Sequence, residues 1–246
     1  LGSGKAYIAV CGVYALCLAL TFGVGIRRLR VLGENEVMLS PLRALRDGFA
    51  YVWSTPVVRS VMLLAFLVNF AAYPLVGSLL AYVAKDVYRL DQTGLGWLIA
   101  SFAGGALAGS ITISMYGAHV RPARTMLVCT VIWLSFNLIF SWTTTPLAGE
   151  VVLFIAGFAQ SFCMIPMSVI LLRVTSPALR GCVMGVRMLA VYGLPMGLLL
   201  SGPIVERAGF AVTGTLYSAV GILFTLAIGL YWRAELWDRA APVNER

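Results

Sequence analysis

Long apolar runs, almost free of charge, dominate the chain. A bilayer core of about 30 Å is crossed by roughly 20 residues of helix, and each run is about that long. The strands of a membrane barrel would alternate polar and apolar residues, which these runs do not. The pattern therefore predicts an all-α polytopic membrane protein of about seven transmembrane helices, at residues 6–26, 60–84, 94–116, 125–142, 147–172, 182–203 and 210–232.

Composition supports lipid as the solvent. Of 246 residues, 60% are apolar and 11% are charged, which is too few charges to cover a water-soluble surface. The net charge of +8 does not indicate a nucleic-acid partner, because the basic residues lie between apolar runs and form no solvated patch.

The arginines and lysines predict the orientation. If the first run crosses from outside to inside, fourteen arginines lie on or near the inner side and four basic residues lie outside, which is the bias expected of cytoplasmic loops. The inner set is Arg27, Arg28, Arg30, Arg43, Arg46, Arg59, Arg121, Arg124, Arg173, Arg180, Arg187, Arg233, Arg239 and Arg246; the outer set is Lys5, Lys85, Arg89 and Arg207. We expect a multi-pass protein of the plasma or inner membrane, with its N-terminus outside and its C-terminus cytoplasmic.

The connection at 27–59 is the longest between two runs. Pro41 begins a helical pattern with Leu42, Leu45, Phe49 and Val52 on one stripe. An apolar stripe beside arginines predicts an amphipathic helix at the membrane surface.

Glycines recur at GxxxG spacing in the third and sixth runs, at Gly105–Gly109 and Gly193–Gly197. Small residues at this spacing let membrane helices approach closely. Static packing explains one such motif on its own.

The two motifs occupy matching places in two helix triplets, 60–142 and 147–232, because each lies in the middle helix. The first helix of each triplet carries a proline, Pro74 or Pro166. Three helices per unit insert in opposite orientations, so the pattern predicts an inverted repeat of the kind found in secondary transporters.

Three segments resemble the major facilitator superfamily, in the branch of enterobactin-type siderophore exporters and related transmembrane secretion effectors. They are Leu45–Val52 followed by Thr55-Pro56, Ser176–Gly181 followed by Val183–Gly185, and the loop Gly117–Arg124. The loop is similar to the family's gating signature through Gly117, Arg121 and Arg124, with Arg180 in the other cytoplasmic loop, but it has Val120 where the family has aspartate and Ala123 where it has glycine.

The resemblance implies a domain organisation. Residues 1–26 would be the last helix of the N-terminal half, 27–59 a cytoplasmic linker, 60–232 the six-helix C-terminal half and 233–246 a cytoplasmic tail. Because the chain begins with Leu1, we interpret it as part of a longer protein whose N-terminal half is its partner. The implied function is secondary active efflux of a small molecule, such as a drug or a siderophore, by alternating access.

The resemblance also implies that the second and fifth helices line the central cavity, whereas the third and sixth face the other half. Candidate substrate-binding residues are Asn69, Tyr73, Gln160, Met164 and Arg187. For Gln160, Asn69 and Tyr73 a hydrogen bond between helices is an equal alternative to lining the cavity, and for Met164 packing is the more common role. For Arg187 the alternative is a side chain that extends to the cytoplasmic face.

Chemical groups for catalysis are missing. No Asp or Glu lies deep in a run, His119 is the only histidine, and the five cysteines form no ligand cluster, so we expect no enzyme, no metal site and no cofactor. A proton-driven antiporter would need its membrane carboxylate in the other half. The alternative function is a truncated membrane helper or structural subunit that transports nothing.

Overall fold

The structure is a computed structural model that describes residues 3–23, 41–117 and 121–237. The chain divides into two compact units, Leu1–Ser40 and Pro41–Arg246. In the smaller unit, α1 (Ser3–Gly23) is apolar on all sides, as suits a helix surrounded by lipid.

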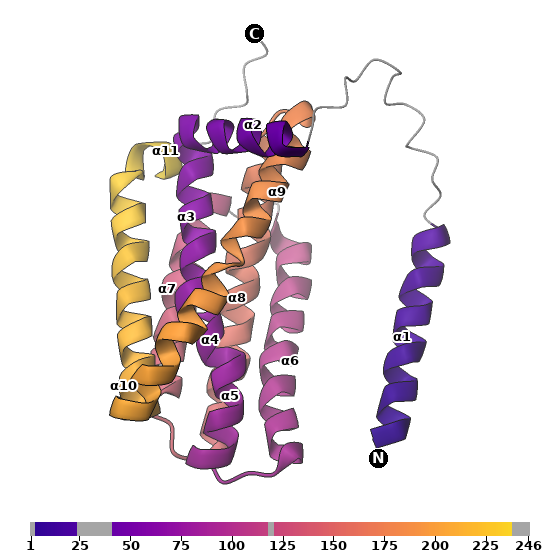
Figure 1. The fold of residues 1–246 in the computed structure, drawn as a ribbon, viewed down its shortest axis with the longest axis vertical. Helices are drawn as coiled ribbons and strands as arrows, with labels where there is room; N and C mark the ends of the chain where they lie inside the picture. Colours follow the sequence, from indigo (N-terminus) through magenta and orange to yellow (C-terminus); the bar gives the residue numbers. More distant parts are fainter. Residues whose placement is uncertain (1–2, 24–40, 118–120, 238–246) are drawn as a thin grey trace. The chain divides into compact units, whose positions relative to one another are not determined.

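The larger unit is a bundle of antiparallel helices, and all its regular elements in the described residues are helical (Figure 1). They are α2 (Pro41–Ser54), α3 (Pro56–Ala71), α4 (Tyr73–Val76), α5 (Ser78–Tyr82), a π-helical turn (Val83–Val87), α6 (Gln92–Tyr116), α7 (Pro122–Phe140), α8 (Pro146–Val174), a 3₁₀ turn (Pro177–Leu179), α9 (Arg180–Ala190), α10 (Gly193–Tyr231) and α11 (Arg233–Trp237). Proline at the first position of α3, α7 and α8 fixes these starts, because its missing N–H would have no partner there.

In the described residues of the larger unit, five helical stretches are long and apolar enough to cross a membrane. The fifth, Pro177–Tyr231, has 55 residues and turns back on itself at Gly209, where φ is 81°. Figure 1 shows the two arms of α10 as a descending orange and a rising yellow helix, so this stretch makes two passes. The predicted all-α polytopic fold is confirmed, with α1 as a further apolar helix.

Element ends differ from the sequence prediction where charges lie inside helices. Apolar length places the end of the sixth run at residue 203, but the helix continues through Glu206 and Arg207 to the turn at Gly209. The tail predicted at 233–246 begins with α11, whose Leu236 is buried against the bundle. A charged residue at a helix end is compatible with helix when it reaches water, so charge alone misplaces these ends.

The first span of the larger unit is interrupted. Helix α3 ends before Ala72, α4 ends before Gly77, and the span finishes in the π-helical turn. Pro74 contributes to the first break because it cannot donate to a carbonyl of the preceding turn. From α7, the buried Asn137 amide donates a 3.2 Å hydrogen bond to the Ala72 carbonyl. A side chain from a neighbouring helix thus stabilises the interruption, as a break within lipid requires.

Helix α6 packs closely on α8 through its glycines. A methyl group on Gly105 or Gly109 would come within 3.0 Å of the α8 backbone at Phe154 or Phe158. The GxxxG motif of α6 therefore serves contact inside this unit.

The second GxxxG motif packs in a reciprocal way. Gly193 and Gly197 of α10 lie against the α3 backbone at Phe66 and Phe70, again closer than a methyl group would allow. The middle helix of each triplet thus packs on the first helix of the other.

Helix α2 crosses the end of the bundle (Figure 1). Its Gly48 lies against the Cys182 backbone, Tyr51 donates a 3.0 Å hydrogen bond to the Val174 carbonyl, and Val52 is buried. Leu45 and Phe49 of the predicted apolar stripe are exposed instead, which leaves them available to lipid. The contact also places α2 at the same end as the start of α9.

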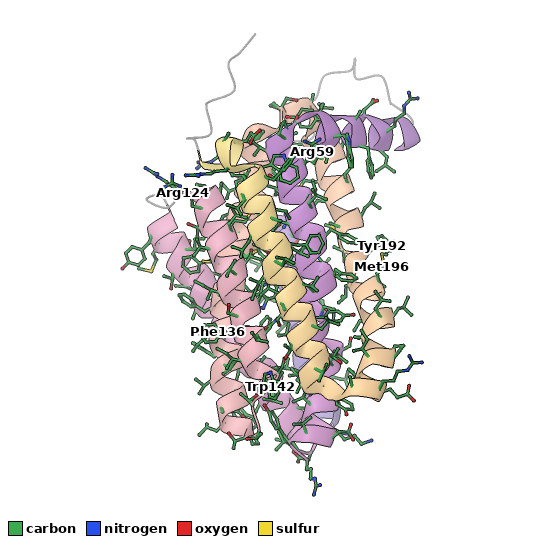
Figure 2. The ribbon with its side chains drawn as sticks, turned by 90° about the vertical axis from the view of Figure 1, so that its left-hand side faces the viewer. Arg59, Arg124, Phe136, Trp142, Tyr192 and Met196 are labelled. Carbon is green, nitrogen blue, oxygen red and sulfur yellow. The ribbon has the colours of Figure 1, made fainter. Side chains whose placement is uncertain are left out.

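Charge is distributed unequally between the two ends of the larger unit. One end carries Arg46, Arg59, Arg121, Arg124, Arg173, Arg180 and Arg233 with Asp47 and Glu235; the other carries Lys85, Arg89 and Arg207 with Asp86, Asp91, Glu150 and Glu206. We call the first the arginine-rich end; Arg59 and Arg124 mark it in Figure 2, with Trp142 towards the other end. Its assignment to the cytoplasm remains a prediction from the positive-inside rule.

Two polar groups order the opposite end. The Asp91 carboxylate accepts a 2.9 Å hydrogen bond from the Gly94 N–H at the start of α6, and this bond lowers the pKa of Asp91. Tyr88 shares a 2.5 Å hydrogen bond with the Thr143 hydroxyl, and burial raises the pKa of Tyr88. Both bonds connect the loop before α6 to its neighbours.

Candidate functional site

A cavity of about 270 Å³ lies between α3, α4, α8 and α9, next to the break in the first span. Its lining includes four of the five predicted substrate-binding residues: Asn69, Tyr73, Met164 and Arg187. Ala65, Met167, Met188 and Val191 complete it. Residues from distant parts of the sequence thus meet around one space, which we call the Arg187 cavity.

Gln160, the fifth predicted residue, contacts a residue of the cavity lining. Its Nε2 donates a 2.9 Å hydrogen bond to the Tyr73 hydroxyl, and it is absent from the cavity lining. The structure therefore has the hydrogen bond between helices, the second of the two roles considered for Gln160. The Tyr73 ring also packs edge-on against the buried Trp133 at 5.1 Å. Two neighbouring helices thus fix the orientation of Tyr73.

Arg187 is the only charged residue in the lining of this cavity. It lies about two turns into α9. One guanidinium nitrogen donates a 2.7 Å hydrogen bond to the Ser168 hydroxyl, which in turn donates to the Met164 carbonyl. A serine hydroxyl accepts this bond without neutralising the guanidinium, whose remaining N–H groups keep the capacity to bind an acceptor. The side chain therefore lines the cavity, in contrast to the extended alternative.

The other residues that line the Arg187 cavity are flexible and weakly polar. Asn69 donates a 2.8 Å hydrogen bond to the Ala65 carbonyl of its own helix. The cavity is also lined by Met164, Met167 and Met188, whose flexible thioethers adapt to irregular ligand shapes. This arrangement offers one cation, a phenol and an amide in an otherwise apolar space.

Sequence reasoning missed Met188 and Val191 in the lining. Val191 follows Arg187 by four residues, so the helix face that carries the arginine could have identified it, whereas the adjacent Met188 is not at such a spacing. Ser168 and Trp133 were also missed, because the contacts that involve them in the site join different helices.

The predicted gating residues line no part of the Arg187 cavity and lie at the arginine-rich end. Gly117 follows the last turn of α6, Arg121 directly precedes α7 and is exposed, and Arg124 is in its first turn. Arg180 begins α9 and donates a 3.3 Å hydrogen bond to the Thr175 carbonyl. The position where the resembling family has aspartate, Val120, lies outside the described residues. A gating role for these four residues stays a prediction.

Among the described residues, no three His, Cys, Asp or Glu side chains lie together as metal ligands would.

The chain is similar to known multidrug efflux pumps. It is 28% identical over 206 residues to the multidrug efflux pump Tap of Mycolicibacterium fortuitum, a match that covers 82% of this chain and 48% of the relative. It is 26% identical over 171 residues to the multidrug efflux pump Tap of Mycobacterium tuberculosis (strain H37Rv) and of Mycobacterium bovis (strain BCG Pasteur), covering 69% of this chain and 40% of each relative. No protein-family model and no solved structure matches the chain.

The chain therefore spans about half the length of the curated relatives it matches. Together with the apolar helices, these relatives indicate a multi-pass membrane protein related to efflux transporters rather than to enzymes.

Proposed function

We propose that this chain forms the C-terminal half of a secondary drug-efflux transporter of the major facilitator type, together with the last helix of the N-terminal half. The observation that carries the proposal is the Arg187 cavity beside an interrupted helix, in a chain related to efflux pumps. Secondary transporters bind substrate near mid-membrane, where a helix is broken and its polar groups are accessible.

The reciprocal packing supports an inverted repeat. The glycines of α6 contact α8, and the glycines of α10 contact α3, so the two triplets exchange equivalent contacts. A half built in this way moves as one rigid body, because its helices contact at backbone distance. Alternating access then consists of this body rocking against the N-terminal half.

Helix α6 is the least buried of the five spanning stretches in the larger unit. Its glycine face is occupied by α8, while Leu107 and Ile111 are exposed. We assign this exposed face to contact with the N-terminal half, as expected for the third predicted helix. In the same proposal, residues 27–59 are the cytoplasmic linker between halves and the arginine-rich end is cytoplasmic.

The cavity lining defines a substrate class. Arg187 attracts an anionic or strongly accepting group and repels a cation, since the lining contains no carboxylate. Asn69 and Tyr73 add hydrogen-bonding groups, and the methionines accept apolar rings. We assign to this half amphipathic molecules with a carboxylate, phenolate or enolate. The cavity is smaller than a usual drug site, so the N-terminal half would supply the other wall. Drugs and siderophores both belong in a test panel.

Coupling to protons would depend on the other half. In the described part of the spans, no acidic side chain lines the Arg187 cavity, and a proton carrier within lipid is usually a carboxylate.

The test is transport by the full-length protein in inside-out vesicles, with an anionic fluorescein-type dye and a cationic rhodamine-type dye. Arg187→Gln removes the charge, Asn69→Ala removes an amide, and Arg207→Gln at the opposite end is the matched control. We expect Arg187→Gln to lower transport of the anionic dye by about ten-fold or more, because charged hydrogen bonds contribute about 1.5–3 kcal/mol. Equal transport of the anionic dye by Arg187→Gln, Asn69→Ala and the unmodified protein would refute the site.

A further inference from the structure

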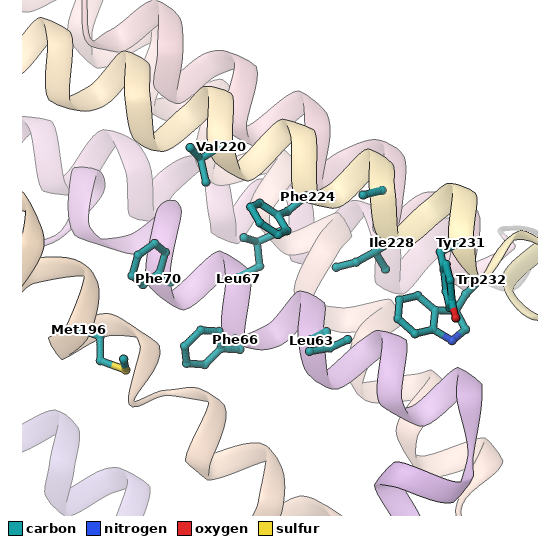
Figure 3. Close-up of a pocket in the computed structure, with 11 residues that line it drawn as sticks. Leu63, Phe66, Leu67, Phe70, Met196, Val220, Phe224, Ile228, Tyr231 and Trp232 are labelled. Atoms are coloured by element: carbon teal, nitrogen blue, oxygen red, sulfur yellow. The ribbon is translucent and has the colours of Figure 1, made fainter.

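A second and larger hollow lies on another side of α3. It is a groove of about 620 Å³ between α3 and the 210–231 arm of α10, with Met196 from the other arm at its side. Figure 3 shows Phe66, Phe70 and Phe224 around its middle, with Tyr231 and Trp232 at one end. The lining residues are Leu63, Phe66, Leu67, Phe70, Met196, Val220, Phe224, Ala227, Ile228, Tyr231 and Trp232.

The groove is apolar along its whole length. Only the Tyr231 hydroxyl and the Trp232 indole nitrogen offer polar side-chain groups, and both lie at the same end. From Val220 to Trp232 it follows about 18 Å of helix. The hydrocarbon of one leaflet is half of a core of about 30 Å, so the groove has the depth of one acyl chain in its leaflet.

Positive charge meets the groove at its Trp232 end. The Arg59 guanidinium lies over the Trp232 ring, 5.4 Å from its centroid. Arg59 donates a 3.4 Å hydrogen bond to the Trp53 carbonyl, while its buried Nε has no hydrogen-bond partner. The exposed Arg233 follows Trp232 directly, and exposed Glu235 is the only acidic residue of α11. This is the arginine-rich end of the larger unit.

We propose that the groove binds one anionic phospholipid, with an acyl chain along Phe66 and Phe224 and the phosphate at Arg59 and Arg233. Basic groups between membrane helices bind anionic headgroups, and tryptophan and tyrosine favour the level of the headgroups. The charge at one end, the aromatic pair beside it and the leaflet-deep apolar slot match the three parts of such a lipid. A partner helix is about 10 Å thick and would need a broad face to dock on, whereas this slot is bounded by α3 and the two arms of α10.

The lipid site differs from the Arg187 cavity in position and composition. Residues Leu63, Phe66 and Phe70 of α3 face the groove, and Ala65 and Asn69 face the cavity. A variant that loses the lipid site can therefore be detected by a lipid-binding measurement, without any transport assay.

The test is native mass spectrometry of the full-length protein in detergent, titrated with phosphatidylglycerol or with phosphatidylcholine of the same chains. Arg59→Gln removes the charge and Ala227→Phe fills the groove. The matched controls are Arg207→Gln at the opposite end and Ala219→Phe, at an exposed site of the same arm of α10 that is not part of the groove lining.

We expect the unmodified protein to retain one phosphatidylglycerol tightly. The affinity for this lipid should be about five-fold weaker in Arg59→Gln and partly restored in Arg59→Lys, and binding should be lost in Ala227→Phe. Both control variants should bind it as the unmodified protein does. Equal retention of the two lipids, or equal losses in Arg207→Gln, would show nonspecific adsorption and overturn the proposal. Unchanged phosphatidylglycerol binding in Ala227→Phe would overturn it as well, even if Arg59→Gln failed to fold.

Discussion

The Arg187 cavity and the apolar groove that ends at Trp232 share α3, yet they differ in almost every other property. The cavity is the smaller of the two and contains a charge, an amide and a phenol; the groove is more than twice as large and has polar groups only at one end. Size alone would select the groove as the substrate site. We propose that the cavity is the substrate site instead, because a charged group within the membrane is costly and usually functional, whereas an apolar hollow that faces lipid can be filled by lipid.

The comparison also shows how one helix serves two sites. Successive residues of a helix turn by about 100°, so Asn69 and Phe70 point to different sides of α3. The interruption after Ala71 lets Tyr73 continue the cavity side while α10 still packs on Phe70 through Gly197. The two sites therefore share a backbone and differ in side chains.

The largest effect is expected from Gly197→Ala, which tests whether both sites depend on the α3–α10 contact. Its new methyl group would lie 2.9 Å from Pro74 Cγ and closer still to the Phe70 carbonyl oxygen. Overpacking of this kind costs about 1–3 kcal/mol. We expect a clear fall in thermal stability, measured by size-exclusion chromatography with fluorescence detection, and weakened dye transport and lipid binding.

Gly202→Ala is the matched control in the same arm of α10, because a methyl group added there would meet no neighbouring atom within 4 Å. It should be neutral or slightly stabilising, since alanine favours helix over glycine. If both substitutions lower the thermal stability of the protein equally, the close approach of α10 to α3 at Gly197 is not what maintains the two sites.

The second effect separates the sites by removing the cavity charge. Arg187→Met makes the cavity nearly as apolar as the groove while keeping a long side chain. We expect anionic dye transport to fall about ten-fold or more, with phosphatidylglycerol binding unchanged, because distant sites act additively. A parallel fall in lipid binding would show that the two sites are one.

A smaller effect concerns the orientation of Tyr73. The bond from Gln160 predicts an interaction energy of about 0.6 kcal/mol between Tyr73→Phe and Gln160→Leu, the usual size for hydrogen bonds between membrane helices. A double-mutant cycle of unfolding free energies measures it. Additive effects would mean that the bond contributes nothing to stability.

The smallest effect is expected at Asp91, at the end remote from the lipid site. Its pKa is lowered in the folded protein by the Gly94 N–H, so the carboxylate stabilises the fold above its ordinary pKa of 3.8 and loses this effect as the pH falls through the lowered value. The difference in thermal stability between the unmodified protein and Asp91→Ala should be present at pH 7 and shrink on acidification. A difference that stays constant with pH would assign the effect to something other than this charge.

Much of the fold was predictable because lipid imposes simple rules. Apolar length located the helices, and the matching glycines of α6 and α10 identified the helices that approach closely. Pro74 marks the break near Ala72 in the sequence, but the hydrogen bond that stabilises the break comes from Asn137, which is far along the chain and could not be identified from local pattern. Local pattern also places the end of the sixth helix too early, since Glu206 and Arg207 remain helical next to the turn.

The candidate site was predictable in part. Helical spacing put Asn69 and Tyr73 on one face, and polarity selected Gln160 and Arg187 as unusual within lipid. Which of them line a cavity depends on how helices pack, so the sequence could not show that Gln160 donates a hydrogen bond to Tyr73 and is not part of the cavity lining. The groove gave no sequence signal at all, because its phenylalanines look like any lipid-facing residue.

The turn at Gly209 has a consequence for biogenesis. A single glycine with φ of 81° joins the two arms of α10, so no loop separates them. Because the connection is a single turn, we expect the two arms to enter the bilayer together as a helical hairpin. A side chain with a β-carbon at this position would strain the hairpin while it forms, so its cost would show in the yield of inserted protein as well as in the finished bundle.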